Sequence, residues 1–498
     1  MNPIPETGLD PANWDDIRTL GHQMIDDMVD YLKNIGERKP YTPIPQGTKN
    51  EFKKPLPHQP SNIFNIYDEF KQHILPYPAG NIHPKFFSWV QGTGTPMGAL
   101  ADLLAGVMNN NAAIGNQSAL YVDQQVINWC KEMLNYPVNG SGMLVSGGSV
   151  ANITALIVAR STIIAGSKNE GVYAANGKLT AYCSAETHNC VGKAAEVIGI
   201  GNENLRKIPV NDAYEIDVTL LKNKIADDKA NGFVPFCIIG NAGTVNTGAI
   251  DPLDDLLQIA RDEKIWLHID GAFGALAKLV PEYQTRLQAI EQADSVAFDL
   301  HKWMYMQYEV GCVLFKDAAT HRAAFANAVS YLTAHDRGLA SGPDSTSNYG
   351  MELSRGFKAL KVWMSLKEHG IDKYATVIAQ NISQCFYLGY LIEKQSSLEL
   401  MAAVNMNIVC YRYNPGGLDD EQLNQLNKEL LMRMHETGVA TPSSTLLNGK
   451  YVIRVANTNH RTRRHHLDEM IAGTIEIGDQ LMKEFEAKLF KFDIINLK

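Results

Sequence analysis

The sequence has no apolar run near the roughly 18 residues that a membrane-spanning helix needs. Its first residues include neither the basic stretch nor the apolar stretch that marks a secretory signal. Seven cysteines are scattered over 498 residues without a Cys-x-x-Cys pair, which favours reduced thiols. The net charge of −9 argues against a phosphate-backbone binder, which needs a basic face. We therefore expect a cytoplasmic protein whose partners include neither nucleic acid nor a membrane.

The chain divides by pattern into three parts. Residues 14–36 place apolar side chains three and four positions apart, and a proline-rich stretch follows, so we expect residues 1–97 to form a helical arm that packs on another surface, such as a second subunit. Across residues 98–370, short apolar β-rich runs alternate with helical stretches, which predicts an α/β domain with a mostly parallel sheet. Residues 371–498 predict a smaller α+β domain. Ligands of parallel sheets bind beyond the carboxyl ends of the strands.

Two charged residues follow apolar runs of the predicted sheet. Lys302 comes shortly after residues 296–298, and a desolvated lysine has a lowered pKa, which makes it a nucleophilic amine for carbonyl compounds such as pyridoxal phosphate (PLP). Asp270 ends another run, and PLP needs an acid beside its pyridine nitrogen because the protonated ring is the better electron sink. The plain alternatives are a lysine that reaches solvent and an aspartate that caps the next element.

Three more strand ends carry residues that suit the same cofactor. The Gly/Ser turn at residues 146–152 lies between a strand-like run and a helical run, so Gly148 and Ser149 would open an anion-binding helix N-terminus. The turn matches neither Gly-x-Gly-x-x-Gly nor a P-loop, which disfavours a nucleotide. His188 is placed to stack on a cofactor ring, and Thr244 to donate a hydrogen bond to its phenolic oxygen. Each has an ordinary structural explanation alone, but their joint order favours a PLP site.

The sequence resembles the group II PLP-dependent amino-acid decarboxylases, the family of aromatic-L-amino-acid, histidine and glutamate decarboxylases. The resemblance covers nearly the whole chain and is most specific at His268–Ala272 and His301–Trp303, with further matches at 83–87, 355–363 and 459–462. It implies the PLP-dependent transferase fold (aspartate aminotransferase-like, fold type I). It also implies a homodimer with active sites at the interface, and decarboxylation of an L-amino acid to an amine and carbon dioxide.

The resemblance also implies roles for individual residues. Lys302 would hold PLP as a Schiff base, Asp270 would pair the pyridine nitrogen, and His188 and Ala272 would lie on the two faces of the ring. Asp299 would lie on the phosphate side, where an acid is awkward. The cofactor-binding residues predicted in this way are Gly148, Ser149, His188, Thr244, Asp270, Ala272, Asp299, His301 and Lys302.

Catalysis is predicted to need Lys302, His188 and Tyr331. The tyrosine matches a mobile-loop residue that protonates the substrate carbon, on a lid-like loop at about 326–348. The predicted substrate-binding residues are Trp89, Gln91, Gly92 and Ser354.

The substrate prediction is an L-amino acid with an aromatic or imidazole side chain. Residues 89–92 and 109–114 are more polar and roomier than in aromatic-specific relatives, so an acidic substrate such as glutamate is the alternative. An aminotransferase or cysteine desulfurase of the same fold, and a non-catalytic binding protein, are the competing hypotheses. His460, His465 and His466 are interpreted as part of a basic helix start, and no metal site is predicted.

Overall fold

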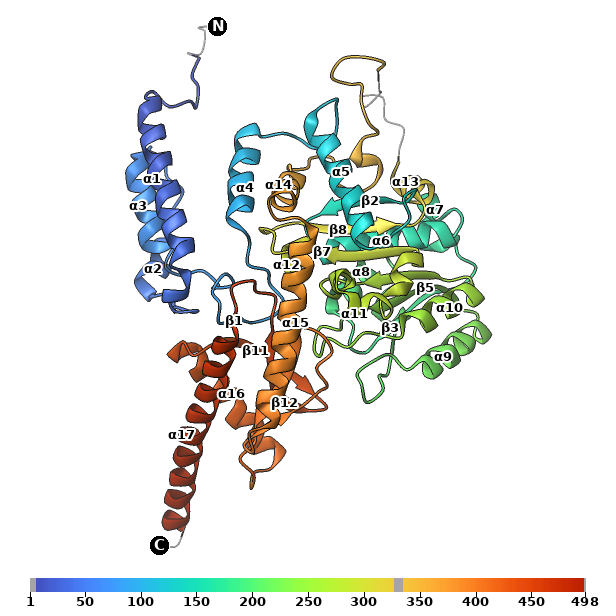
Figure 1. Cartoon of the computed structure of the whole chain (residues 1–498). Helices are drawn as coiled ribbons and strands as arrows, with labels where there is room; N and C mark the ends of the chain where they lie inside the picture. The colour runs from blue at the N-terminus through green and yellow to red at the C-terminus, as the bar shows by residue number, and fades with distance from the viewer. Residues whose placement is uncertain (1–5, 327–334, 497–498) are drawn as a thin grey trace.

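A seven-stranded sheet forms the centre of the largest part of the chain, and helices cover both of its faces (Figure 1). The computed structural model describes residues 6–326 and 335–496. One strand, β8 (Gly311–Phe315), runs antiparallel to both of its neighbours, and every other pair in this sheet is parallel. The prediction of a mostly parallel sheet is confirmed. In spatial order the strands are β2 (Ser141–Val145), β8, β7 (Ser295–Asp299), β6 (Trp266–Asp270), β5 (Val234–Asn241), β3 (Leu179–Ser184) and β4 (Leu205–Ile208).

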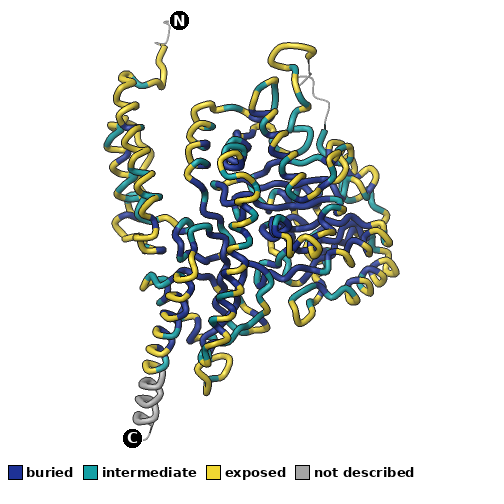
Figure 2. The backbone as a smooth tube through the Cα atoms, viewed as in Figure 1, coloured by how far each residue is buried: buried dark blue, intermediate teal, exposed yellow. Residues whose placement is uncertain are grey.

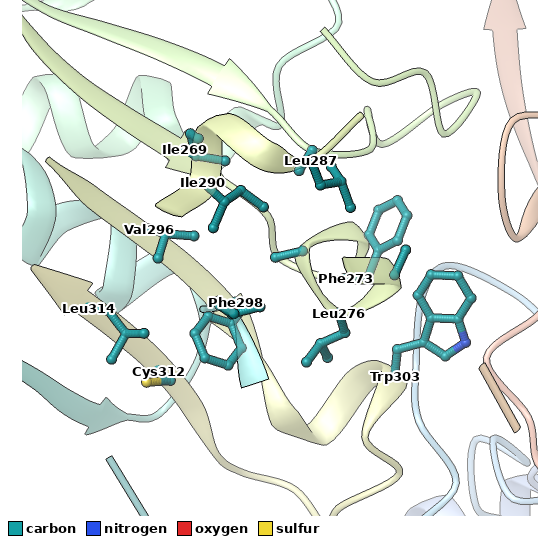
Figure 3. Close-up of a cluster of buried hydrophobic side chains, with 14 of the residues drawn as sticks. Ile269, Phe273, Leu276, Leu287, Ile290, Val296, Phe298, Trp303, Cys312 and Leu314 are labelled. Atoms are coloured by element: carbon teal, nitrogen blue, oxygen red, sulfur yellow. The ribbon is translucent and has the colours of Figure 1, made fainter. Parts of the chain in front are cut away.

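Apolar side chains pack against both faces of this sheet. On one face, Ile269, Val296 and Leu314 belong to a large buried cluster (Figure 3). On the other face, α6 (Gly148–Ile163) and α8 (Asn189–Val197) cover a second buried cluster. Because successive residues of a strand face opposite sides, burial of both sides produces nearly continuous apolar runs in the sequence. This is why short apolar runs in the sequence predicted strands in this part of the chain.

A second, five-stranded sheet is formed mainly by the C-terminal part of the chain. Its first strand, β1 (Phe86–Phe87), comes from the N-terminal part and pairs in parallel with β11 (Thr441–Leu447). The remaining pairs are antiparallel. The predicted small α+β domain therefore includes a strand from far outside 371–498. The other strands are β12 (Lys450–Ala456), β10 (Ile408–Tyr413) and β9 (Leu398–Leu400).

Helices α16 (Asp420–Thr437) and α17 (Arg464–Asn496) pack against the second sheet, and α15 (Ile371–Glu393) lies beside it (Figure 1). The boundary expected at 370/371 falls at the start of α15, whereas the one at 97/98 falls inside α4 (Pro96–Met108). The domain boundaries stay a prediction. The other α-helices between residues 118 and 369 are α5 (Ser118–Met133), α7 (Ser167–Glu170), α9 (Val218–Ala230), α10 (Leu253–Glu263), α11 (Pro281–Gln284), α12 (Leu300–Trp303), α13 (Ala318–Phe325) and α14 (Ala359–His369).

The N-terminal helices stand apart from the sheets and expose much of their surface (Figure 2). They are α1 (Trp14–Lys33), α2 (Gln46–Glu51) and α3 (Ile63–His73). The predicted amphipathic helix is present as α1, but of its side chains only Leu20 is buried. Among residues 6–326 and 335–496, no helix combines the length and the apolarity needed to cross a membrane.

Candidate active site

A cavity of about 710 Å³ lies beyond the carboxyl ends of the central strands. It is lined from the end of β6 by Asp270, from the end of β7 by Asp299, and from the turn before α6 by residues 146–148. Polar side chains that are dispersed in the sequence meet here because parallel strands end at the same edge of a sheet. Eight of the nine predicted cofactor-binding residues line this cavity: Gly148, Ser149, His188, Asp270, Ala272, Asp299, His301 and Lys302.

Lys302 lies on the single turn of α12, directly after β7. Its Nζ is 2.8 Å from Oδ2 of Asp299. Burial works to lower the pKa of Lys302, but the carboxylates of Asp299 and Asp270 outweigh burial, and the pKa is raised. The predicted lowered pKa is therefore wrong for the chain without its cofactor, because the sequence pattern did not show that two acids face the amine. The amine of Lys302 stays charged as long as the carboxylates of Asp299 and Asp270 outweigh the effect of burial.

Asp270 ends β6 and is only 5% exposed. Its Oδ1 accepts the backbone N–H of Ala272 at 3.1 Å, and its Oδ2 accepts a hydrogen bond from Nδ2 of Asn152 at 3.1 Å. Burial raises the pKa of Asp270, and the charge of Lys302 opposes that rise. A carboxylate fixed in this way at the edge of a cavity suits a protonated ring nitrogen.

The turn before α6 forms a close-fitting cradle. A Cβ atom on Gly148 would lie 3.0 Å from Oδ2 of Asp299, and one on Gly147 would lie 3.2 Å from Cε1 of His301. Glycine therefore permits the close approach of this backbone to the end of β7, where a side chain would force Asp299 or His301 to shift by a few tenths of an ångström. The first intrahelical bond of α6 runs from Ala151 N to Gly147 O, so the N–H groups before it are available to an anion at the helix N-terminus.

Asp299 lies beside the anion-binding turn, where a carboxylate would repel a bound anion. Its Oδ1 is buried and accepts no hydrogen bond. Its Oδ2 pairs with Lys302 and lies 3.8 Å from Nε2 of His301. The charged amine of Lys302 offsets the carboxylate, whereas burial lowers the pKa of His301, so that ring is neutral near pH 7 and contributes no charge.

His188 is the N-terminal cap of α8. Its Nδ1 accepts the backbone N–H of Cys190 at 3.2 Å, which leaves Nε2 to carry the proton of the neutral ring. Burial lowers the pKa of His188, so the ring is neutral near pH 7. A neutral, anchored imidazole at the cavity wall suits a flat ring stacked against it, with Ala272 also lining the cavity.

These residues fit PLP, since the cavity offers an amine for its aldehyde, an acid for its ring nitrogen and a glycine cradle for its phosphate. Thr244 is not placed at the cavity, because its buried Oγ1 contacts Thr247 and accepts the N–H of Ala249 inside its own turn. Among the predicted substrate-binding residues, Trp89 and Gln91 line the cavity. Ser354 is exposed elsewhere.

Two other predicted site residues are Gly92 and Tyr331. A Cβ atom on Gly92 would lie 2.2 Å from the carbonyl oxygen of His301, so this glycine permits close packing behind the lysine turn and does not line the cavity. Tyr331 lies outside the described residues, and its role stays a prediction.

Among the cavity residues that sequence reasoning did not single out, Arg454 and Asn152 carry polar groups that bear on function. Arg454 on β12 donates hydrogen bonds to the carbonyl oxygens of Asn246 and Trp89, while its buried Nη2 has no hydrogen-bond partner among the residues that the structure describes. Burial lowers its pKa to about 10, so it is charged near pH 7. A charged residue inside the apolar run 452–455 was the signal for it. Asn152 on α6 gave no such signal, because an asparagine in a first helical turn is ordinary.

The fold and this cavity define a PLP-dependent enzyme of fold type I. The model of the pyridoxal-dependent decarboxylase conserved domain matches residues 45–414. The chain belongs to the pyridoxal-dependent decarboxylase family, and it is a PLP-dependent amino-acid decarboxylase.

Named relatives agree with this assignment. The chain is 32% identical to an aromatic-L-amino-acid decarboxylase of Bacillus atrophaeus, over 90% of this chain and 92% of that protein. It is 28% identical to tryptophan decarboxylase 2 of Oryza sativa subsp. japonica, over 93% of this chain and 94% of that protein.

Solved structures share the fold. The structure of Oryza sativa TDC with PLP and tryptamine has a TM-score of 0.87 at 23% identity, covering 95% of this chain and all of that one (100%). The structure of mouse CSAD also has a TM-score of 0.87, at 21% identity, covering 94% and 99% of the two chains. The predicted fold class is confirmed.

Proposed function

We propose that this decarboxylase acts on an L-amino acid with an aromatic or imidazole side chain. The observation that carries the proposal is the single cavity that gathers Lys302, Asp270 and the glycine cradle, with Trp89 and Tyr308 at its wall. Aromatic rings at the wall suit a flat substrate side chain. The decarboxylases of Bacillus atrophaeus and Oryza sativa named above carry aromatic amino acids in their names, which supports the same class.

Bound PLP supplies the electron sink that makes loss of the α-carboxylate feasible. The roles that we propose for the chain are as follows. Lys302 supplies the amine that holds the cofactor and later accepts or returns a proton at Nζ. Asp270 keeps the ring nitrogen protonated, and His188 holds the ring in plane. The N–H groups of residues 148–150 bind the phosphate.

Arg454 is the proposed partner of the substrate carboxylate. It lines the cavity, it is charged, and its Nη2 has unused hydrogen-bonding capacity. A guanidinium binds a carboxylate in a defined direction, which would orient the bond that breaks. The same residue is the observation that favours the second candidate, an acidic substrate whose side-chain carboxylate would meet Arg454.

The lid role of Tyr331 is also a proposal. The described part of its loop packs on the segment that precedes α5: Asn116 N donates to Leu339 O at 2.8 Å, and Thr346 N donates to Ala113 O at 3.0 Å. These contacts support a loop anchored at its far side. Replacing Tyr331 with Phe is expected to lower amine formation and to raise oxidative aldehyde formation, in which dissolved oxygen accepts two electrons to give hydrogen peroxide and the amino group leaves as ammonia. Unchanged products from Tyr331→Phe would contradict the assignment.

A homodimer is proposed from the exposed apolar faces of the N-terminal helices. Val29 of α1 is 56% exposed, and Val107 of α4 is 78% exposed, with Leu103 and Leu104 beside it on α4. Apolar faces of this kind mark subunit interfaces. Light scattering on the purified protein should give twice the chain mass. The exposed apolar faces of α1 and α4 should be covered in that dimer. The free, buried cysteines support the proposed cytoplasmic location.

A panel of L-amino acids tests the substrate proposal. The purified protein with PLP is incubated with tryptophan, tyrosine, phenylalanine, dopa, histidine and glutamate, and both amine and carbon dioxide are measured. We expect an aromatic or imidazole substrate to have the highest kcat/KM. A preference for glutamate that Arg454→Gln abolishes would establish the second candidate. Keto-acid formation without carbon dioxide would contradict both.

A further inference from the structure

A chain of buried hydrogen bonds reaches Asp270 from behind. The indole N–H of Trp266 donates to Oγ of Ser295 at 2.8 Å, and that oxygen lies 2.9 Å from Nδ1 of His268. Nε2 of His268 lies 2.6 Å from Oδ1 of Asn152, whose Nδ2 donates to Oδ2 of Asp270 at 3.1 Å. None of the five side chains is more than 6% exposed. Trp266, Ser295 and His268 are therefore buried behind the cavity, which Asn152 and Asp270 line.

The strand geometry explains how these residues meet. Trp266, His268 and Asp270 alternate along β6, so all three face the side that α6 covers. Ser295 is the direct partner of His268 in the register between β6 and β7. Asn152 is fully buried in the first turns of α6.

The two ends of the chain fix its direction. An indole nitrogen can only donate, and an ionised carboxylate can only accept. Burial lowers the pKa of His268 to about 3, so its ring is neutral and carries one proton. That proton must lie on Nε2, because Oδ1 of Asn152 is an acceptor, and Ser295 then donates its hydroxyl proton to Nδ1. In this direction each bond of the chain has one donor and one acceptor, and the second N–H of the Asn152 amide donates to Sγ of Cys190 at 3.4 Å.

The direction matters because an asparagine side chain can be turned over. If the proton of His268 moved to Nδ1, Nε2 would become an acceptor. Asn152 would then form the better hydrogen bond by turning its NH₂ group towards Nε2. Its oxygen would then face Oδ2 of Asp270, and two oxygens in a buried site repel each other. His268 and Ser295 keep the proton on Nε2, and this prevents the Asn152 amide from turning over.

We propose that Asn152 is a positioning residue, which His268 and Ser295 lock in one orientation so that it aims the Asp270 carboxylate at the pyridine nitrogen and keeps it ionised. The inference rests on the proposed role of Asp270 in cofactor binding. Burial raises the pKa of Asp270, and the charge of Lys302 and the backbone N–H of Ala272 oppose this rise. A second N–H donor to the carboxylate, from Asn152, acts in the same sense by favouring the ionised form. In this proposal Asn152 acts through its hydrogen bond to Asp270.

The test measures the dissociation constant of PLP for the full-length, cofactor-free protein, from the visible absorbance of the bound cofactor. Asn152→Leu and His268→Leu should each weaken PLP binding by about tenfold, the size expected for a lost hydrogen bond to a charged group. His268→Gln can donate to Asn152 and accept from Ser295, so it should bind PLP within about threefold of the unmodified protein. Equal loss in His268→Gln and His268→Leu would overturn the directional role.

Thr154→Val is the matched control. Thr154 is buried on the same helix, and its hydroxyl donates to the carbonyl oxygen of Val150 in that helix at 2.7 Å. We expect no change in PLP binding. A tenfold loss in this variant would show that any disturbance of α6 weakens the site, and it would overturn the inference.

A double-variant cycle separates positioning from simple structural damage. If Asn152 acts through Asp270, adding Asn152→Leu to Asp270→Asn should weaken PLP binding by less than about threefold further. A full additional tenfold loss would overturn the inference. If Asp270→Asn alone leaves PLP binding unchanged, the proposed role of Asp270 itself fails, which is a different result.

Ser295→Ala keeps the test decisive if Asn152→Leu does not fold, because it removes one hydroxyl group and no more. PLP binding should weaken by roughly threefold, and the visible circular dichroism of the bound cofactor should fall, since the ring is held less firmly. Unchanged binding together with unchanged dichroism would overturn the inference.

Discussion

The two faces of β6 differ in the kind of residue they carry. One face presents Trp266, His268 and Asp270 to α6, and the other buries Leu267 and Ile269 in an apolar cluster (Figure 3). Polar groups are costly to bury unless each one is paired, so the first face needs its complete hydrogen-bond chain. The second face needs only close packing. Alternation along one strand thus separates the part that serves the cofactor from the part that stabilises the fold.

The largest effect on activity should come from Lys302, which lines the same cavity as Asp270 on the polar face of β6. Lys302→Ala and Lys302→Arg should both lower kcat by at least roughly 10³-fold, as is usual for loss of a covalent catalytic group. Lys302→Arg retains a cation beside Asp299, so its thermal unfolding should change little. Amine formation is measured by chromatography. Substantial activity in either variant would remove Lys302 from the centre of the mechanism.

Substitution on the apolar face should have the opposite profile. Leu267 is 1% exposed on the same strand, so Leu267→Ala should lower the free energy of unfolding by about 2–5 kcal/mol. Chemical denaturation measures this loss, and the PLP affinity of the folded protein should stay the same. A variant that keeps its stability but loses PLP binding would show that the two faces are not separable.

The dependence of stability on pH should distinguish the faces as well. The folded-state pKa of His268 is about 3, below its usual 6.5, because burial disfavours the charged ring. The unfolded chain therefore binds the additional proton as the pH falls below 6.5, and stability is lost progressively towards pH 3. His268→Gln should remove up to about 1.4 kcal/mol of this loss per pH unit. Denaturation at pH 7.5, 6 and 5 measures it, and an unchanged pH slope would contradict the assignment.

The smallest effect is expected at Thr244, whose hydroxyl serves its own turn. Thr244→Val should leave PLP affinity unchanged and should cost about 1 kcal/mol of stability. Parallel PLP titration and thermal unfolding measure both. Weaker PLP binding would restore Thr244 to the cofactor site that the sequence predicted for it.

The sequence predicted the central strands and most of the cavity because one rule governs both. Residues that follow buried parallel strands meet at one edge, so His188, Asp270 and Lys302 could be grouped from their positions alone, whereas Asp299 was predicted from the family resemblance. Position after a strand does not say where a side chain points. Thr244 follows the rule in sequence yet turns inward, because nearby groups in its turn take up its hydroxyl.

The remaining site residues depend on contacts between distant segments. Asn152 meets His268 across 116 positions, and Arg454 meets Asn246 across 208. No local periodicity encodes such pairs. The raised pKa of Lys302 was missed for the same reason, since it reflects the distances to two carboxylates rather than burial alone.

The pairing of β1 with β11 has a consequence for synthesis of the chain. The hydroxyl of Ser88, next to β1, donates to the carbonyl oxygen of Thr441, 353 positions later. At ribosomal rates of about 5–20 residues per second, the early segment waits roughly 20–70 seconds for its partner to emerge. During that interval the pair Phe86–Phe87 has no strand to join. The second sheet is therefore completed late, and a nascent chain that stops before residue 441 should remain a substrate for chaperones.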